Sequence, residues 1–337
     1  MRILHAPTEV AGQLSIISRA QRKEGHKSDV WLFSQSHYQY EYDYSLEHNH
    51  RTLIGKLWIR FTCFFKAILS YDIFHFHGGV SLWPYGLDIP LLKLFGKKVV
   101  MEYWGSDIIQ TDIMKKFSYL KDEDFLKYLP KIDDDGKRVA LRRMAHLVDK
   151  MIVGDSSLQI FFPSSVVINK VVDLSKLPYV GAMPSKKITV IHAPTHRVVK
   201  GTKHILKAVK LLKKEKYKFN FVLIEKKPHQ EALEMFKKAD IIIDDVLQGP
   251  YGILATECMA LGKPVLCHIH PKQSIFYPNL PVISSNPDNI YLNLKDLLEH
   301  PKKRERLGAL GRKYVEENHD SLKIAKQLIK LYKDLYD

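Results

Sequence analysis

The segment 244–265 combines glycines, a strand end and an apolar helix in a way that suits phosphate binding. Gly249 and Gly252 follow an apolar strand, and a helix is expected to begin at Tyr251 or Gly252. Glycine lets the backbone approach a ligand, and the first N–H groups of a helix carry partial positive charge, so this loop predicts a phosphate cradle. Glu257 follows within about two turns of the helix start, where its carboxylate could accept two hydrogen bonds from a ribose diol. The alternative, a glutamate that complements the helix dipole, fits less well this far into the helix.

Two cations precede a second predicted helix. Arg197 and Lys200 lie in the stretch 195–202, which follows the strand 188–193 directly. Cations beside a helix N-terminus would stabilise the negative charge that develops on a departing diphosphate. The alternative of solvated surface cations stays open from the residues alone, more so for Arg197 than for Lys200.

The first half of the chain offers fewer candidate groups. Gly12 and Gln13 end the loop after the first strand, where the backbone could approach phosphates. One histidine at the end of the strand 73–77 is expected in the core and the other, His77, towards ligand, although a core or loop role explains His77 equally well. Asp107 is expected either to orient sugar or acceptor or to cap a helix.

These residues are set in a regular alternation of strands and helices. Strands are predicted at 2–5, 28–33, 73–76, 98–103 and 150–153, and, after a Pro- and Ser-containing stretch at 173–187, at 188–193, 219–224, 241–243, 264–268 and 282–283. The pattern predicts an α/β protein of two doubly wound, Rossmann-like domains with parallel sheets covered on both faces. We expect residues 1–172, completed by a C-terminal helix over 320–337, to form the first domain and 173–319 the second. Ligands bind beyond the carboxyl ends of such strands, so a cleft between the domains is the expected site.

The segment around Glu257 resembles the signature of the GT-B glycosyltransferases of family 4, which are retaining enzymes. In that signature two glutamates stand eight positions apart around a Gly-Phe-Gly-like turn, followed by Glu-Ala-Met-Ala-x-Gly-x-Pro-Val. Glu257 matches the second glutamate and residues 259–265 match the tail, whereas Gly249 occupies the place of the first glutamate.

Other parts of the chain extend the resemblance. Lys200, followed by glycine, is similar to the family's Gly-Arg…Lys-Gly element, although Arg197 lies nearer the lysine than the usual arginine does. The loop with Gly12 resembles the family's loop after the first strand, which approaches donor phosphates. Trp104 stands where a His-Gly-Ser-Asp element usually has histidine, and Asp107 is retained.

The resemblance implies a GT-B fold, with two Rossmann-like domains facing each other across a cleft. It implies transfer of a hexosyl unit from a UDP- or GDP-sugar to a saccharide or lipid-linked hydroxyl acceptor, with retention and without a required metal or further cofactor. Bacterial cell-surface polysaccharide or glycolipid assembly is the expected pathway. The expected catalytic residues are Lys200, Arg197 and Asp107. The expected nucleotide-sugar contacts are Gly12, Gln13, Gly249, Tyr251, Gly252, Ile253 and Glu257, and the expected acceptor contacts are His77 and Trp104.

The bulk composition bears on location and partners. The net charge of +15 attracts anions of any kind, and the three cysteines, odd in number and without metal spacing, favour a reducing compartment. Without a signal peptide or a membrane span, the chain is expected to be cytoplasmic, with contact to the inner face of the plasma membrane left open. The helix 53–66 interleaves aromatics with cations and could lie on an anionic membrane. We favour a crossover helix packed on its sheet, because βαβ architecture requires one here.

Three other functions deserve comparison. Gly249 and Trp104, which depart from the family pattern, would suit a non-catalytic sugar-nucleotide- or polysaccharide-binding subunit. Positive charge alone suggests nucleic-acid binding; the sequence has no recognition motif for it, and no nucleic-acid partner is expected. A nicotinamide-dependent dehydrogenase ranks last, because neither half has Gly-x-Gly-x-x-Gly after its first strand.

Overall fold

The computed structural model describes residues 1–337 except 35–39, 47–51, 120, 129–132 and 182–186. The chain divides into two compact units. Unit 1 consists of Met1–Gln110, Ile132–Val171 and Asp320–Asp337, and unit 2 of Thr111–Lys131 and Val172–His319. No helix among the described residues is both long enough and apolar enough to span a bilayer.

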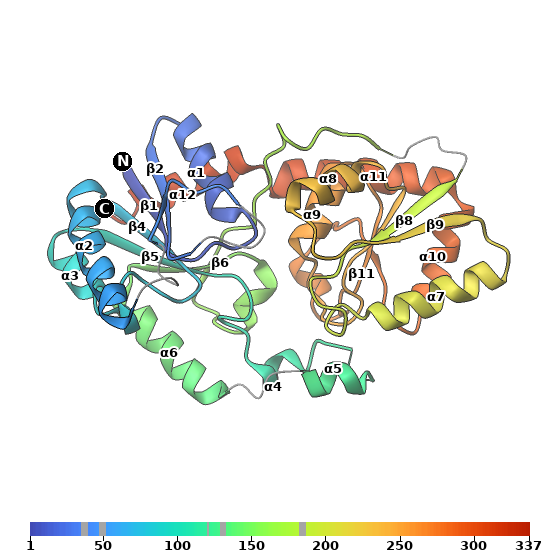
Figure 1. Ribbon diagram of the computed structural model, residues 1–337, viewed down its shortest axis with the longest axis horizontal. Coiled ribbons are helices and arrows are strands. Elements are labelled where there is room, and N and C mark those ends of the chain that lie inside the picture. Colours follow the sequence, from blue (N-terminus) through green and yellow to red (C-terminus); the bar gives the residue numbers. More distant parts are fainter. Residues whose placement is uncertain (35–39, 47–51, 120, 129–132, 182–186) are drawn as a thin grey trace. The chain divides into compact units, whose positions relative to one another are not determined.

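Unit 1 is built on a parallel sheet with the strand order β3-β2-β1-β4-β5-β6-β7 (Figure 1). Its strands are β1 (Arg2–Ala6), β2 (Lys27–Leu32), β3 (Tyr44–Ser45), β4 (Ile73–His77), β5 (Lys98–Tyr103), β6 (Lys150–Val153) and β7 (Val166–Val167). Every residue of β4 is buried, and this is the burial expected of a central strand with helices on both faces.

The helices of unit 1 cover both faces of that sheet. They are α1 (Gln13–Lys23), α2 (Leu53–Ser70), η2 (Pro84–Gly86), α3 (Ile89–Leu94), α6 (Asp134–Leu147), η3 (Ser156–Ile160) and α12 (Ser321–Lys333). Ile17 on α1 and Ile324 and Leu328 on α12 share one buried cluster with the sheet residues Ile3 and Ile73. The C-terminal helix therefore completes the core of unit 1.

Unit 2 repeats the plan with the parallel strand order β12-β11-β10-β8-β9. Its strands are β8 (Ile188–His192), β9 (Phe219–Leu223), β10 (Ile241–Ile243), β11 (Val265–Cys267) and β12 (Ile283–Ser284). Its helices are α4 (Thr111–Met114), α5 (Glu123–Tyr128), α7 (Thr202–Lys214), α8 (His229–Lys237), α9 (Ile253–Ala260), η4 (Ser274–Phe276), α10 (Ile290–Glu299) and α11 (Pro301–Asn318). Two doubly wound α/β units, as expected from the alternating pattern, are confirmed.

The segment Thr111–Lys131 departs from the expected domain boundary. It lies within the range 1–172 that we expected in the first domain, yet it packs with unit 2. Phe125 is fully buried in the unit 2 core, and the backbone N–H of Tyr119 donates to the carbonyl of Leu247 at 2.8 Å. These long-range contacts decide the boundary, and no local pattern signals them.

Candidate functional site

The loop between β10 and α9 has the backbone geometry of an open helix start. The helix begins at Ile253, and Gly252 before it is extended, with φ −93° and ψ −177°. Gly249 has φ +117°, a conformation that side chains rarely adopt. The predicted helix start at Tyr251 or Gly252 is thus one or two residues early.

Lys200 lies at this helix start, held by two buried carboxylates. Its Nζ is 3.2 Å from Oδ1 of Asp244 and 3.5 Å from Oδ2 of Asp245, and a Cβ built on Gly252 would lie 3.9 Å from that Nζ. Burial disfavours the ammonium charge, but the attraction of the two aspartates outweighs it and raises the pKa of Lys200. Lys200 therefore stays protonated. Its charge is balanced by neighbouring carboxylates, which sequence reasoning did not consider.

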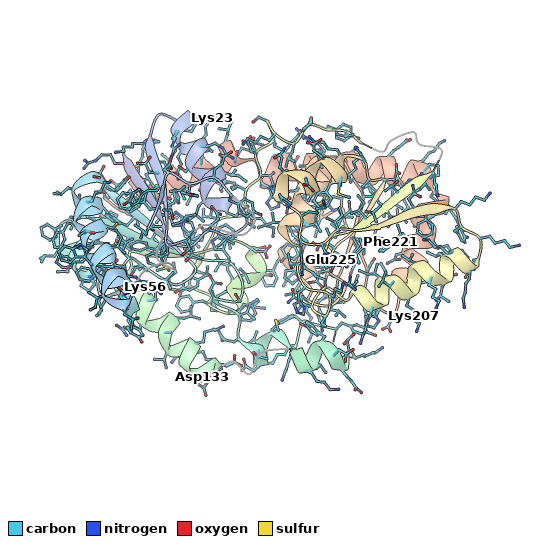
Figure 2. All side chains as sticks on the ribbon, in the orientation of Figure 1. Lys23, Lys56, Asp133, Lys207, Phe221 and Glu225 are labelled. Carbon is cyan, nitrogen blue, oxygen red and sulfur yellow. The ribbon has the colours of Figure 1, made fainter. Side chains whose placement is uncertain are left out.

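Arg197 has a different partner. Its Nε and Nη2 donate to the two carboxylate oxygens of Glu225 at 2.8 Å and 2.5 Å, just beyond the end of β9 (Figure 2). The arginine side chain is 57% exposed, so this is a surface pair of small energetic weight. In this structure Arg197 is engaged with Glu225, and the contact is the surface alternative left open by the sequence.

Glu257 is paired with a histidine that the sequence analysis missed. Its Oε1 lies 2.7 Å from Nε2 of His229, the first residue of α8, and Glu257 itself is 5% exposed. Burial lowers the pKa of His229, but the hydrogen bond and charge of Glu257 outweigh burial and raise it overall. A Pro-His pair opening a helix after a strand is the only sequence signal that could have found His229.

Gly249 occupies a place that no side chain can take in this conformation. A Cβ there would lie 2.6 Å from Oε1 of Gln273 and 2.9 Å from the backbone oxygen of Phe117. Phe117 belongs to the segment that joins unit 2 from the first half of the chain. The glutamate that the resemblance expects at 249 is therefore excluded sterically, and the amide of Gln273 lies where its side chain would begin.

Unpaired buried polar atoms gather in the loops after β10 and β11. Among the described residues, five of ten buried side-chain atoms without a hydrogen-bond partner belong to Asp244, Asp245, His268 and Gln273. One of the five, Oδ2 of Asp245, is the oxygen that lies 3.5 Å from the Lys200 ammonium, so four have neither a hydrogen bond nor this ion pair. Both ring nitrogens of His268 are among them, and burial lowers the pKa of this histidine to about 4. Buried polar atoms normally have partners, so such a concentration at the carboxyl ends of parallel strands indicates a ligand site.

Two other expected contacts serve the structure of their own units. Tyr251 is 4% exposed, and its hydroxyl lies 2.9 Å from Nε2 of His319, so its side chain belongs to the core. Gln13 is 1% exposed; its Nε2 donates to the carbonyl of Val171 at 3.0 Å, and its Oε1 accepts from the Val171 N–H at 2.6 Å. Gly12, the residue just before α1, has φ +82°, a left-handed backbone conformation that favours glycine. The side chains of Tyr251 and Gln13 are thus engaged, contrary to the expected ligand contacts.

His77 is buried, contrary to the expectation that it faces ligand. Residues two apart on a strand share a face, so His75 and His77 both point to the side covered by α1 and α12. His77 Nε2 lies 3.1 Å from His5 Nδ1, and its Nδ1 lies 3.3 Å from the indole nitrogen of Trp104. Trp104 thus contacts His77; His77 is buried in unit 1, whereas Trp104 is only partly buried.

The three histidines of this group have the spacing of a metal site. One ligand atom from each of His5, His75 and His77 lies within 4.8 Å of the others. Five of the six ring nitrogens already have hydrogen-bond partners, and the sixth, Nε2 of His75, lies 3.1 Å from the Glu102 carboxylate. Burial lowers the pKa of His5 and His75 to about 3 and raises that of Glu102, so the whole group is neutral. A neutral hydrogen-bonded cluster explains its burial.

Asp107 caps its own turn. Its carboxylate accepts from the backbone N–H groups of Trp104, at 3.0 Å and 3.1 Å, and of Gly105, at 2.7 Å. Burial raises the pKa of Asp107, against the effect of these hydrogen bonds. These donors precede Asp107 in the chain, and α4 begins only at Thr111, so the carboxylate stabilises a turn and not the start of a helix.

Comparison with solved structures identifies the fold. No protein-family model matches the sequence, and no curated protein matches it. Sucrose-phosphate synthase from Thermosynechococcus elongatus is 15% identical with a TM-score of 0.66, covering 100% of this chain and 99% of that one. HepE from Anabaena in complex with UDP-glucose is 14% identical with a TM-score of 0.66, over 99% and 100% of the two chains. The catalytic domain of starch synthase IV from Arabidopsis thaliana, bound to ADP and acarbose, is 11% identical with a TM-score of 0.60, over 99% of each. The chain has the GT-B fold that its sequence predicts.

Proposed function

We propose that this chain is a glycosyltransferase of EC class 2.4, resembling family 4. It moves a hexosyl unit from a UDP- or GDP-sugar to a hydroxyl acceptor with retention of anomeric configuration, and the pathway we propose is bacterial cell-surface polysaccharide or glycolipid assembly. One observation carries the proposal: Lys200, ion-paired with Asp244 and Asp245, and the unpaired polar atoms of Asp244, His268 and Gln273 gather near the start of the helix that bears Glu257. Solved structures of the same fold contain bound UDP, UDP-glucose or ADP.

The nucleoside occupies the side of α9 that carries Glu257. The Glu257 carboxylate accepts hydrogen bonds from the two ribose hydroxyls, and the paired His229 holds that carboxylate in place and lies where the ribose enters. Because the Glu257 residue is only 5% exposed and its carboxylate is already paired with His229, covering it with the ribose removes little further water and costs little free energy.

The diphosphate occupies the start of α9. The N–H groups of the first helical turn and the Lys200 ammonium face its oxygens. During transfer the bond between the anomeric carbon and the β-phosphate oxygen breaks, and the electron pair stays on the leaving diphosphate. The acceptor oxygen bonds to the anomeric carbon, and its proton passes to an oxygen of the leaving diphosphate. Lys200 stabilises the charge on the leaving group, and Arg197 assists by exchanging Glu225 for phosphate.

Gln273 supplies the sugar contact that Gly249 lacks. Its Oε1 is buried, has no hydrogen-bond partner, and lies beside the space where a side chain at 249 would begin. An amide oxygen accepts a hydrogen bond from a sugar hydroxyl as a carboxylate does, although more weakly. Ring nitrogens of neutral His268 add a donor and an acceptor in the neighbouring loop.

The acceptor belongs to unit 1 in this proposal, at the turn of Trp104 and Asp107. Location is cytoplasmic, at the inner face of a membrane, where a lipid-linked acceptor would be available. Asp107 acts there by fixing the turn, through its hydrogen bonds to the Trp104 and Gly105 N–H groups.

Nucleotide titration of Glu257→Ala tests the proposal. The variant should bind UDP or GDP about 10- to 100-fold more weakly than wild type, because hydrogen bonds to a charged group contribute about 1.5–3 kcal/mol. Glu305→Ala, which removes an exposed glutamate of α11, is the matched control and should bind as wild type does. Calorimetry with UDP, GDP and ADP gives the three affinities and selects the base. Equal affinity in wild type and Glu257→Ala would remove Glu257 from its role.

A second candidate is a sugar-nucleotide-binding subunit without catalysis. The steric closure of position 249 favours it, because the usual glutamate cannot be accommodated. Hydrolysis or transfer of a radiolabelled UDP- or GDP-sugar separates the two. Turnover that disappears in Lys200→Met supports the enzyme, whereas tight binding without turnover supports the subunit.

A further inference from the structure

The helix α2 is packed along one side and bare along the other. Cys63, Phe64, Ala67 and Ile68 are buried, and this half agrees with the crossover helix that we favoured from the sequence. The opposite stripe is formed by large apolar side chains that are 46% to 82% exposed. They are Leu53, Ile54, Leu57, Trp58, Phe61, Phe65 and Leu69.

The bare stripe continues onto neighbouring elements of unit 1. The indole of Trp83 stacks on Phe61 at 5.9 Å between ring centroids, and Trp83 leads directly into η2. Beyond it, the exposed apolar side chains are Tyr85, Leu87, Leu94 and Phe95. We call these eleven residues together the α2–α3 face. Figure 1 shows the helices α2 and α3 in unit 1. A contiguous exposed apolar surface of this size marks a binding surface.

The chain segment that carries the α2–α3 face is rich in positive charge, although Lys93 pairs with Asp149 at 3.3 Å. Between residues 53 and 101 the chain has six cations, Lys56, Arg60, Lys66, Lys93, Lys97 and Lys98, and two carboxylates. One carboxylate, Asp88, is fully buried, and the other, Asp72, is paired with Arg2 at 2.6 Å. Lys56 extends from α2 at the outer edge of the unit (Figure 2).

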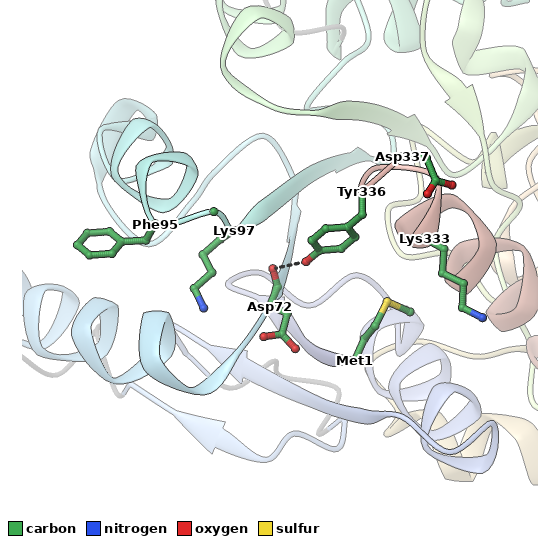
Figure 3. Close-up of a pocket in the computed structure, with 8 residues that line it drawn as sticks. Met1, Asp72, Phe95, Lys97, Lys333, Tyr336 and Asp337 are labelled. Carbon is green, nitrogen blue, oxygen red and sulfur yellow. Dashed lines mark hydrogen bonds between the residues drawn. The ribbon is translucent and has the colours of Figure 1, made fainter.

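A hollow of mixed charge lies at the end of α3. It is lined by Lys97 and Lys333, with Asp72 and Asp337 on its other walls, and Phe95 stands at its edge with its ring directed away (Figure 3). The Lys97 ammonium also donates to the carbonyl of Tyr71 at 2.8 Å, which ties α3 to the end of α2.

We propose that the α2–α3 face docks unit 1 on an anionic lipid bilayer. Aromatic and aliphatic side chains enter the boundary between headgroups and acyl chains, and the lysines around them bind lipid phosphates, as amphipathic interfacial helices do. A second copy of this chain fits the face less well, because two-fold self-association would oppose six cations with six. The inference rests on the proposed function in one respect: docking would give the enzyme access to a lipid-linked acceptor. Binding to the bilayer itself does not depend on catalysis.

Vesicle co-sedimentation with the full chain tests this inference. Wild type should bind vesicles of phosphatidylcholine with about 30% phosphatidylglycerol, and bind pure phosphatidylcholine at least about tenfold more weakly, because each lysine near the surface strengthens attraction to anionic lipid. Added salt should weaken the binding. Leu57→Asp should weaken binding to the anionic vesicles by about tenfold or more, because it places a charge in the apolar contact.

Leu292→Asp on α10 of unit 2 is a matched control, because Leu57 and Leu292 are both 61% exposed. It should bind vesicles as wild type does. Equal binding to neutral and anionic vesicles, or equal losses in the two variants, would overturn the inference. So would a wild-type dimer in light scattering that Leu57→Asp dissociates, since a second copy would then cover the face. Leu57→Asp should keep the nucleotide affinity of wild type, and loss of nucleotide binding in wild type itself would contradict the proposed function instead.

Discussion

At the scale of single residues, the pair of aspartates beside Lys200 determines what this lysine can do. A buried ion pair contributes little net stability, but removal of one partner leaves the other buried and uncompensated. Lys200→Met should therefore lower the free energy of unfolding by about 3–5 kcal/mol, because Asp244 and Asp245 would stay buried without the cation that pairs with them. Equilibrium unfolding in urea, followed by a signal of unit 2, measures the change.

The same variant predicts a pH dependence with a definite sign. Burial, partly offset by Lys200, raises the pKa of Asp245 in the folded state above its value in the unfolded chain. Between those two values the folded state binds more protons, so stability rises as pH falls through the folded pKa. Lys200→Met removes the lysine charge that lowers the pKa of Asp245, so the gain in stability on acidification should be larger and begin at higher pH. Asp245→Asn in the Lys200→Met background is the control, and it should recover stability and flatten the profile. A pH-independent loss would contradict the assignment.

Residue types near a ligand were easier to predict than their partners. The structure places Lys200 near Gly252, before α9, and Glu257 within α9, and motif spacing could indicate this because a strand–loop–helix unit is local. Gln13, Tyr251 and His77 were assigned to ligand and instead lie in the interior, since burial depends on what packs against a residue from elsewhere in the chain. His229 and Gln273 were missed for the same reason: each reaches the site from a different loop.

At the scale of elements, the alternation of strands and helices predicted both sheets, because parallel strands buried on two faces are continuously apolar. The segment 111–131 was placed in the wrong unit. Its helices α4 and α5 are short, and long-range contacts such as the burial of Phe125 and the contact of Asp122 with His204 reveal where they belong. Helix α2 was predicted half correctly, because its packed stripe and its bare stripe are both apolar and the sequence does not distinguish them.

The attachment of that segment predicts a local effect. Phe125→Ala should free α5 from unit 2, because loss of a fully buried phenyl ring costs about 3–5 kcal/mol. The remaining contacts of a six-residue helix are too few to compensate for that loss. Hydrogen exchange with mass spectrometry should show fast exchange in 121–128 and unchanged exchange in β8 and β9. Leu126→Ala, next along α5 and only partly buried, should have a smaller effect. Loss of protection throughout unit 2 would show instead that Phe125 supports the whole core.

At the scale of the whole molecule, two units with separate cores share one chain. Each has its own sheet and its own buried clusters, so the unfolding of one need not follow that of the other. The net charge of +15 acts on the molecule as a whole and would attract a nucleotide, a lipid headgroup or nucleic acid alike. Only the arrangement of particular side chains separates these ligands. The carboxyl ends of β10 and β11 provide that arrangement for a nucleotide.

Binding of a nucleoside diphosphate should therefore stabilise unit 2 and leave the stability of unit 1 unchanged. A ligand that binds only the folded state at about 100 times its Kd adds about 2.7 kcal/mol to the stability of the region it contacts. With saturating UDP or GDP, amide hydrogens of 244–260 and of the first turn of α8 should exchange more slowly. Amides of β1 and β4 in unit 1 should be unchanged, and Glu257→Ala should abolish the protection at equal ligand concentration. Protection confined to unit 1, around Gly12 and Gln13, would place the nucleotide on the other sheet. It would also leave the unpaired atoms of Asp244, His268 and Gln273 without a ligand to explain them.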